Sequence, residues 1–498
     1  MLRGDLRHTE AGAVRLRPVL VVVVVLGVLA AGLLVWRPGL VDDVRDAFTS
    51  SPAPPDPDDD PADVDPPSGL DLPAVPAPPP VAAPREPADT GVPDAAAVRR
   101  ALAGPLRDRD LGGRVVVGVS GLATDRGDRP VLLGAREAAV PASTTKVMTA
   151  AAALEALGPE RRFATRVVDG GTRGGVAEVV LVGGGDPLLA SAPDPDRPLG
   201  EPARADLRTL AEDTAETLRA DGTRRVRVAW DDTLFDGPPA SPTWEDDYLS
   251  SGVVSPVSAL WADRGVRPDE VRAPDPARAA AGTFAAALRE AGVRTPGAPR
   301  AATAPTGATE LARVTGLPVD LLVEHLLETS DNEVGEVLAH QVGLAVAGEG
   351  SFRGGSRGVT ATLRDLGVGL AGVRLNDGSG LSRANRLTAT ALLDVLDLAA
   401  APDRPELRSV LTGLPVAGFS GSLTNRFATV DPAGLGAVRG KTGTLTGVSG
   451  LAGVVTTADG AVLSYAVLAD RIDPVDTLGA IQAVDRLVAA LAACRCAA

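Results

Sequence analysis

Two lysines and two serines have types and spacings in this sequence that could support covalent chemistry. The chain contains 49 lysines and arginines together, but only Lys146 and Lys441 are lysine. Lys146 follows Ser143 by three residues in the segment PASTTKVMTA, at the predicted start of a helix. This spacing places both side chains on one helix face, one turn apart.

A serine hydroxyl becomes an effective nucleophile when a neighbouring base accepts its proton. Neutral lysine can be that base when burial or a nearby cation lowers its pKa, whereas arginine stays protonated in proteins. This difference gives a physical reason for a lysine at position 146 in a chain that otherwise uses arginine. The alternative is that Lys146 only covers a helix surface, because a lone S-x-x-K pattern is common by chance.

Two further short motifs follow the serine–lysine pair. The sequence SDN occupies residues 330–332 in a strongly helical region, and KTGT occupies residues 441–444 at the start of a β-rich run. The ordered set S-x-x-K, S-D-N and K-T-G occurs in β-lactamases and penicillin-binding proteins. Because the set contains both lysines of the chain, we interpret the three motifs as parts of one site.

The chain resembles the D-alanyl-D-alanine carboxypeptidase/endopeptidase family, the class C low-molecular-mass penicillin-binding proteins of the serine-type penicillin-recognising superfamily. The resemblance extends from about residue 94 to the C-terminus and includes LVGGGDPLL, WDDTLFDG, SPVSAL, DGSGLSRANRLTA and LPVAGFSGSLTNRF. Ser143 and Ser330 are 187 residues apart (330 minus 143), and Ser330 and Lys441 are 111 apart (441 minus 330). A long first gap is typical of this family, in which an extra module is inserted there.

The resemblance implies that the protein hydrolyses the D-Ala-D-Ala end of peptidoglycan stem peptides. Ser143 would attack the carbonyl carbon and Lys146 would accept its proton. The positive charge of Lys441 would help to keep Lys146 neutral. Ser330 would relay the proton to the leaving D-alanine, and Asn332 would hold Lys146 and the substrate amide.

The resemblance also implies how the KTGT strand would bind substrate. The backbone N–H groups of Ser143 and Thr444 would form the oxyanion hole. Lys441, Thr442 and Thr444 would bind the terminal carboxylate, and Gly443 would let the strand approach closely. A β-lactam antibiotic would acylate Ser143 and remain attached. The reaction needs no cofactor or metal.

The motifs leave three activities open. The first is an active DD-peptidase that cleaves D-Ala-D-Ala ends, as a carboxypeptidase, or D-Ala cross-links, as an endopeptidase. The second is a catalytically quiet wall-binding protein on the same fold, and the third is a β-lactamase. The sequence shows no loop with the deacylating glutamate of class A β-lactamases, and the intact motifs favour the DD-peptidase.

Other polar residues are interpreted as structural. The stretch DGSGLSRAN, residues 377–385, is read as a capped turn outside the site. His325 and His340 are read as ordinary helix residues, because no G-x-S-x-G elbow accompanies them. Only one residue separates Cys494 from Cys496, so a mutual disulfide would be strained, and no metal site is predicted.

The elements around the motifs indicate an α/β penicillin-binding/β-lactamase-like domain. Residues 114–123 and 131–135 read as strands, and residues 143–157 read as a helix. The C-terminal meander contains the turn Ala458-Asp459-Gly460, so its strands should be antiparallel. We predict an antiparallel sheet with helices on both faces, beside a helical subdomain that carries SDN. This DD-peptidase domain would comprise residues 94–162 and 300–498, with an inserted β-rich module at 163–299.

The N-terminal part predicts a membrane-attached protein. Residues 19–36 form an uncharged apolar stretch long enough to cross a bilayer, preceded by a short arginine-containing segment, residues 1–18, that should stay in the cytoplasm. Residues 37–93 are rich in proline and aspartate and predict an extended linker. The catalytic part would lie outside the cell membrane. The alternative is a cleaved signal peptide and a secreted protein.

Composition excludes one class of partner. The chain has 498 residues and a net charge of -15. No basic patch in the sequence could neutralise a run of phosphates, so we predict no nucleic-acid binding.

Overall fold

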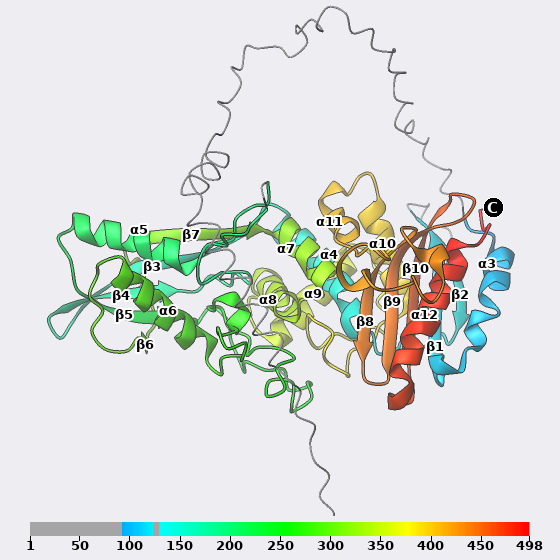
Figure 1. Ribbon diagram of the computed structural model, residues 1–498, viewed down its shortest axis with the longest axis horizontal. Helices are drawn as coiled ribbons and strands as arrows, with labels where there is room; N and C mark the ends of the chain where they lie inside the picture. The colour runs from blue at the N-terminus through cyan, green and yellow to red at the C-terminus, as the bar shows by residue number, and fades with distance from the viewer. Residues whose placement is uncertain (1–91, 123–128, 199, 498) are drawn as a thin grey trace, which may run out of the picture. The chain divides into compact units, whose positions relative to one another are not determined.

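The computed structural model describes residues 92–122, 129–198 and 200–497 (Figure 1). The predicted cytoplasmic segment, membrane span and nearly all of the linker lie outside these residues. Within the described ranges, no helix is long and apolar enough to span a membrane.

An antiparallel sheet of five strands forms the base of the predicted DD-peptidase domain, in the order β2-β1-β10-β9-β8. Its strands are β1 (Arg114–Gly121), β2 (Val131–Gly134), β8 (Val438–Leu445), β9 (Val448–Thr456) and β10 (Val462–Asp470). The predicted strands at 114–123 and 131–135 are confirmed, as is the antiparallel pairing across the turn at 458–460. Strand β8, which carries KTGT, lies at the edge of this sheet.

Helices cover both faces of this first sheet, as predicted. Helices α3 (Ala95–Leu102) and α12 (Thr477–Ala492) pack on one face, where β1 contributes Val117 and Val119. Helices α4 and α10 pack on the other face, against Ala452, Ala466 and Leu468. The two faces therefore have separate apolar cores.

A helical lobe surrounds α4, the helix that begins just after Ser143. Every residue of α4 from Thr145 to Leu154 is buried, and the four consecutive residues 150–153 are alanines. A helix that is apolar on all sides belongs in a protein interior, and small side chains let neighbouring helices approach closely. The helices of this lobe are α4 (Thr145–Leu157), α7 (Val319–Thr329), α8 (Asn332–Val342), α9 (Phe352–Asp365), α10 (Ala389–Ala400) and the short α11 (Ser409–Thr412).

A second five-stranded sheet, in the order β6-β5-β4-β3-β7, lies within the same compact unit. Strand pairs β4–β5 and β5–β6 are parallel, and the other two pairs are antiparallel. Helices α5 (Leu207–Ala220) and α6 (Pro276–Glu290) cover one face of the sheet. The strands are β3 (Arg162–Arg173), β4 (Val176–Val182), β5 (Val226–Asp231), β6 (Arg300–Ala301) and β7 (Glu310–Pro318).

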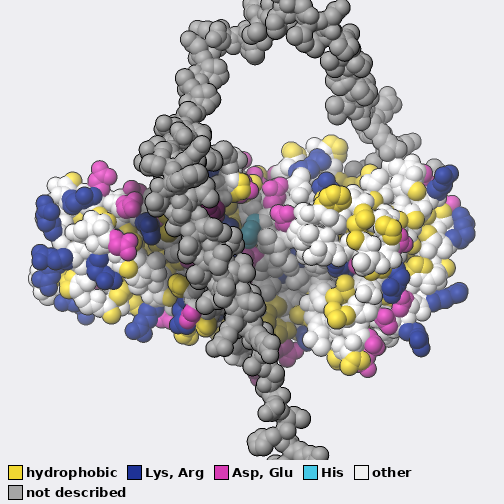
Figure 2. All heavy atoms as spheres, viewed as in Figure 1, with side chains coloured by type: hydrophobic (Ala, Val, Ile, Leu, Met, Phe, Trp, Pro, Cys, Tyr) yellow, Lys and Arg dark blue, Asp and Glu magenta, His cyan; other side chains and the backbone are white. Residues whose placement is uncertain are grey.

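We call residues 162–318 the second-sheet module; basic side chains are numerous on its visible surface (Figure 2). The predicted inserted module, residues 163–299, stops short of β6 and β7, which pair with β5 and β3. The module is also more helical than the predicted β-rich insertion. Helix α5 was missed, although Asp206 caps it and its buried residues recur at helical spacing.

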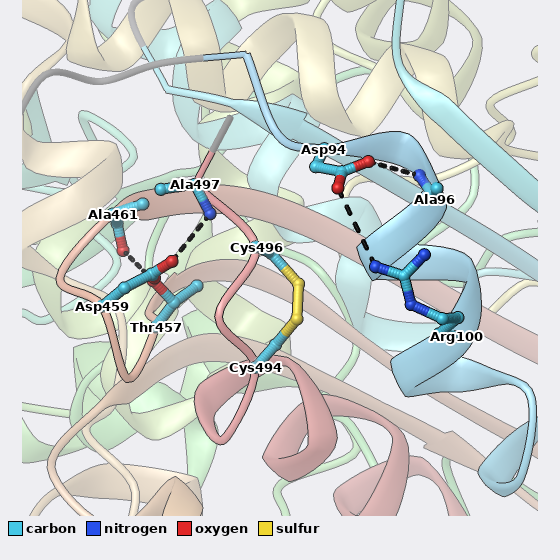
Figure 3. The surroundings of a disulfide bond; sticks show 9 residues. All are labelled: Asp94, Ala96, Arg100, Thr457, Asp459, Ala461, Cys494, Cys496 and Ala497. Carbon is cyan, nitrogen blue, oxygen red and sulfur yellow. Dashed lines mark hydrogen bonds and ion pairs between the residues drawn. A yellow bond between two sulfur atoms is a disulfide. The ribbon is translucent and has the colours of Figure 1, made fainter.

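The C-terminal residues are joined by a disulfide between Cys494 and Cys496 (Figure 3). The sequence predicted only that such a disulfide would be strained. Their Cα atoms are 5.4 Å apart, within the usual range for a disulfide, because the chain turns directly after α12. Nearby, Asp459 accepts a hydrogen bond from the backbone N–H of Ala497 at 2.9 Å and so ties the chain end to the β9–β10 turn.

Candidate active site

Ser143 and Lys146 form the centre of the candidate site. Ser143 lies in a single 3-10 turn, Ala142–Thr144, that runs directly into α4, and its side chain is half-buried. Lys146 is in the first turn of α4 and is fully buried. Its Nζ donates a hydrogen bond to Ser143 Oγ at 2.9 Å. The predicted one-turn spacing therefore brings the two reactive atoms into contact.

The Lys146 ammonium has two further acceptors, Asn332 Oδ1 at 2.9 Å and the Ser379 carbonyl at 2.7 Å. Burial lowers the pKa of Lys146 to about 8, and the negative charge of Glu336 opposes part of that shift. A base with this pKa is neutral in a useful fraction of molecules near neutral pH and can accept a proton from Ser143.

The second cluster joins the SDN and KTGT motifs. Lys441 Nζ donates to Ser330 Oγ at 2.8 Å and to the Thr442 carbonyl at 2.9 Å. Ser330 ends α7 in the left-handed conformation, with φ 62°, and Asp331 caps α8 directly after it. This tight turn between two helices points the Ser330 hydroxyl at the lysine on β8.

Both lysines are buried, and their charges repel one another. Burial lowers the pKa of Lys441 well below its usual value, and the positive charges of Lys146 and Arg426 lower it further. The resemblance implied that the charge of Lys441 keeps Lys146 neutral. Burial is the first cause of the lowered Lys146 pKa, and the mutual repulsion between the two lysines adds to the cost of charging both of them.

Gly443 explains how β8 comes so close to the turn that carries Ser143. A Cβ atom at this position would lie 2.5 Å from the Pro141 carbonyl oxygen, so only glycine fits without displacing the strand.

The outer edge of β8 carries backbone N–H groups. The Gly440 N–H points away from β9 and donates to the Pro415 carbonyl. Because N–H directions alternate along a strand, the Thr442 and Thr444 N–H groups face the same open edge. Thr442 Oγ1 also donates to Ser422 Oγ at 2.9 Å.

The structure thus gathers the predicted residues on one edge of the first sheet. Lys146 contacts both Ser143 and Asn332, and Lys441 links Ser330 to Thr442. Gly443 packs against the turn before Ser143, and Thr444 follows it on β8 with an exposed side chain.

The turn at residues 377–380 also belongs to the site, so the prediction that it lies outside is wrong. The carbonyl of Ser379 accepts from Lys146, and the carbonyl of Gly378 accepts from Thr149 Oγ1 at 2.7 Å. Glu336, buried on α8, accepts from the backbone N–H groups of Gly378 and Ser379 and holds the turn in place. Burial raises the pKa of Glu336 to about 8.

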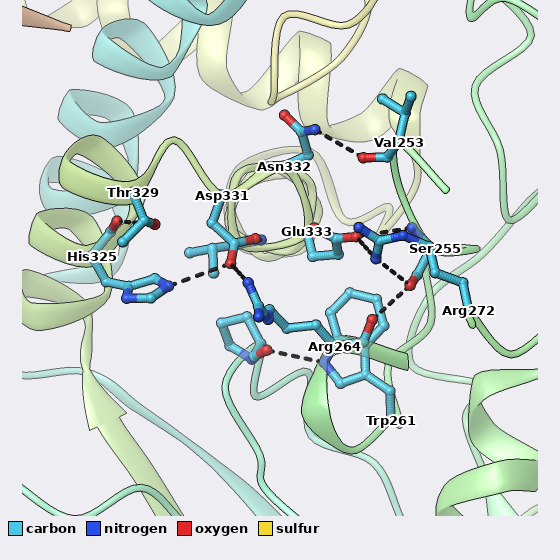
Figure 4. Close-up of polar contacts among 12 residues, drawn as sticks. Val253, Ser255, Trp261, Arg264, Arg272, His325, Thr329, Asp331, Asn332 and Glu333 are labelled. Carbon is cyan, nitrogen blue, oxygen red and sulfur yellow. Dashed lines mark hydrogen bonds and ion pairs between the residues drawn. The ribbon is translucent and has the colours of Figure 1, made fainter. Parts of the chain in front are cut away.

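Contacts from the second-sheet module support the SDN turn (Figure 4). Asn332 Nδ2 donates to the Val253 carbonyl at 3.1 Å, and Arg264 binds Asp331 at 2.7 Å. Burial would raise the pKa of Asp331, but its hydrogen bond with His325 and the charge of Arg264 more than offset burial, and that pKa lies below its ordinary value. Asp331 is therefore a carboxylate that holds Arg264 and caps α8.

Glu333, two residues further along the chain in the first turn of α8, also contacts the second-sheet module. It binds Arg272 and accepts from the Ser255 N–H at 2.9 Å. The module thus touches the first turn of α8 at three consecutive residues, 331–333.

A serine–lysine pair, an S-D-N turn and a K-T-G edge strand on an antiparallel sheet define the class of penicillin-recognising serine enzymes. A family model, described as the D-Ala-D-Ala carboxypeptidase 3 (S13) family, matches residues 100–275 and 266–491. The chain belongs to this family. It is an enzyme of the serine-type carboxypeptidase class.

Curated relatives cover most of the chain. A carboxypeptidase of Mycobacterium tuberculosis is 37% identical over 421 residues, which is 82% of this chain and 87% of the relative. The D-alanyl-D-alanine carboxypeptidase of an Actinomadura species is 32% identical, covering 71% of this chain and 78% of the relative. Both comparisons extend across the second-sheet module as well as the first sheet.

A solved structure shares the fold. The crystal structure of penicillin-binding protein 4 from Haemophilus influenzae superposes with a TM-score of 0.62 at 20% identity, covering 79% of this chain and 98% of the other. The predicted penicillin-binding fold, with an antiparallel sheet and flanking helices, is confirmed.

Proposed function

We propose that this protein hydrolyses the terminal D-Ala-D-Ala bond of peptidoglycan stem peptides, with Ser143 as nucleophile and Lys146 as its base. One observation carries the proposal: a buried lysine, with its pKa lowered to about 8, donates to the Ser143 hydroxyl at 2.9 Å. In its neutral form the same nitrogen can accept the hydroxyl proton. Arginine could not replace lysine in this step.

Acylation transfers the peptide from D-alanine to the enzyme. Ser143 Oγ forms a bond to the carbonyl carbon of the penultimate D-alanine, while its proton passes to Lys146. The bond from that carbon to the terminal nitrogen then breaks. The proton held by Lys146 then passes to the leaving amine through the hydroxyl of Ser330, which already accepts a hydrogen bond from Lys441, and Lys146 returns to its neutral form. Terminal D-alanine is released, and the rest of the peptide stays bound to Ser143 as an ester.

The edge of β8 binds the substrate. Its outward N–H groups can hydrogen-bond the peptide as an added strand, and the Thr444 N–H lies on the edge where the oxyanion would form. Lys441, Thr442 and Thr444 bind the terminal carboxylate. Water then attacks the ester and regenerates Ser143. A β-lactam acylates the same hydroxyl by opening its ring, and no separate group leaves.

We also propose that the catalytic part acts outside the cell membrane. The support is the apolar stretch at residues 19–36 and the proline-rich linker at residues 37–93. The linker would let the enzyme reach peptides away from the bilayer surface. Peptidoglycan and the membrane are thus its proposed partners.

Mass spectrometry after treatment with benzylpenicillin tests the site. We expect one adduct, on the peptide that contains Ser143, and none in Ser143→Ala. Release of D-alanine from a stem peptide ending in D-Ala-D-Ala should be lost in the same variant. A wild-type protein that forms no adduct and releases no D-alanine would support a catalytically quiet wall-binding protein. Rapid turnover of penicillin without a lasting adduct would support a β-lactamase.

A further inference from the structure

A cleft lies at the C-terminal ends of α4 and α8, the two helices that carry Lys146 and Asn332 near their N-terminal ends. It encloses about 930 Å³ between the C-terminal ends of α4 and α8 and the second sheet. Ala156 and Leu157 of α4 and Gln341 of α8 line one side. Ala164 and Arg166 of β3 line the other. Because Val167 packs beneath α5 and α6, its neighbour Arg166 projects from the face opposite these helices.

The cleft is separate from the active site. Leu157 follows Ser143 by 14 residues (157 minus 143), which is about 20 Å along a helix at 1.5 Å per residue. None of the eight predicted site residues lines it. A single ligand that contacts both places must therefore be longer than about 20 Å.

Arginines give the cleft a positive charge. Arg161, Arg162, Arg166 and Arg313 line it with a single carboxylate, Asp231. Outside the lining, Glu310 pairs with Arg313 at 2.9 Å and lies 3.9 Å from Arg166. Four positive and two negative groups leave a local charge of about +2, in a chain whose net charge is -15.

Two of these arginines face each other across neighbouring strands. Arg166 of β3 is directly opposite Arg313 of β7, and like charges in that position destabilise a sheet. Glu310 reduces the repulsion but lies closer to Arg313. An anion bound between the two strands would offset the remaining repulsion between Arg166 and Arg313. Arginine is suited to this because its planar fork matches a carboxylate with two parallel hydrogen bonds.

We propose that this cleft binds a carboxylate-bearing strand of peptidoglycan, the polymer whose peptide ends the active site cleaves. The proposal rests on the proposed function for the identity of the polymer. A second contact about 20 Å from Ser143 keeps the polymer close after each cleavage and raises the effective concentration of the next peptide. Short soluble peptides are too small to use both contacts.

The test compares two double variants of the purified full-length protein. Arg161→Gln with Arg166→Gln removes two charges from the cleft. Arg99→Gln with Arg100→Gln removes two charges from exposed residues of α3, outside the cleft. The measurements are co-sedimentation with peptidoglycan sacculi stripped of attached phosphate-rich polymers, and D-alanine release from a short soluble stem peptide.

We expect the cleft variant to bind the stripped sacculi about tenfold more weakly than the α3 variant, because hydrogen bonds to charged groups are lost. Release of D-alanine from the soluble peptide should be unchanged in both variants. Equal binding by the two variants would overturn the proposal. So would binding that requires sacculi still carrying the phosphate-rich polymers.

The outcomes separate this proposal from the proposed function. A wild-type protein that binds sacculi but releases no D-alanine would contradict the function alone. If the double variant unfolds, the single variant Arg161→Gln replaces it in the test. The Arg161 side chain is exposed, so its loss should not unfold the protein. The single variant should still bind the sacculi more weakly than wild type, and unchanged binding would count against the cleft.

Discussion

Lys146 is the residue on which the proposed chemistry depends most directly. Its nitrogen contacts the nucleophile, an asparagine and a backbone carbonyl within a fully buried pocket. Those contacts orient the nitrogen, while burial lowers the cost of losing its proton. Position and proton affinity are therefore set by the same surroundings.

Lys146→Arg should abolish most acylation while keeping a positive charge at the position. Arginine remains protonated, so the base is lost, and general base catalysis typically contributes about 10²- to 10⁴-fold. The second-order rate of acylation by a fluorescent penicillin measures this loss. Ser143→Ala, which should form no adduct, sets the background. A Lys146→Arg rate close to wild type would exclude Lys146 as the base.

The pH dependence of acylation follows from the same residue. The active form of Lys146 is neutral, and its pKa is lowered to about 8. The rate should therefore rise with pH through about 8 and level off above it, which is opposite to a mechanism that needs the ammonium form. The measurement is kcat/KM for a soluble stem peptide, with thermal unfolding followed over the same pH range as the control. A rate that falls as the pH rises toward 8 would contradict this assignment.

At the scale of elements, three segments that are distant in sequence meet at the start of α8. They are the first turn of α4, which contacts Asn332 through Lys146, the second-sheet module, which contacts Asn332 through Val253, and strand β8, whose Lys441 contacts Ser330. The residues that could be predicted from the sequence were those whose types are rare or fixed by chemistry. Both lysines, the S-D-N turn and the glycine of K-T-G are in this group. The approach of β8 to Pro141 shows why that glycine is needed.

Other parts of the site could not be predicted because they leave no residue-type signal. The Ser379 carbonyl is a backbone atom, and any residue there would supply it. The support for the SDN turn comes from Val253 and Arg264, which precede their partners by 79 and 67 residues. No short-range pattern links such positions. Arginine is also so common in this chain that Arg264 does not stand out.

The contact between Arg264 and Asp331 gives a prediction for the second-sheet module. The Asp331 side chain is fully buried, so Arg264→Met should leave its charge partly unpaired and destabilise the protein by about 1–2 kcal/mol. Because Asp331 caps the helix that begins at Asn332, acylation should also slow. Thermal unfolding and penicillin acylation measure the two effects.

Arg267→Met is the matched control for Arg264→Met. Arg267 lies three residues away and pairs with Asp269, but both side chains of that pair are exposed, at 45% and 58%. Such pairs contribute about 0–1 kcal/mol, so this variant should resemble wild type in both measurements. If both variants acylate at the wild-type rate, the module does not position the SDN turn.

At the scale of the whole molecule, the described unit contains both sheets and every predicted site residue. The residues that the family model matches, 100–275 and 266–491, lie within the same unit. The second-sheet module is joined to the active site through α8, and the proposed arginine cleft lies at the other end of that helix. We interpret the module as acting at both ends of α8. It supports the SDN turn at the N-terminal end of the helix, and it forms the proposed binding cleft for the wall polymer at the C-terminal end.

The N-terminal segment should determine where the enzyme works without affecting its chemistry. A chain that begins at Pro84 keeps the whole described unit, so it should fold and be acylated by penicillin at the wild-type rate. It should also remain in the supernatant when membranes are sedimented, whereas the full chain should sediment with them because residues 19–36 can span a bilayer. Acylation rates and fractionation of both chains from the same cells provide the measurement. A full chain found in the medium, shortened near residue 30, would instead establish a cleaved signal peptide, and slower acylation of the shorter chain would give the N-terminal segment a part in the site.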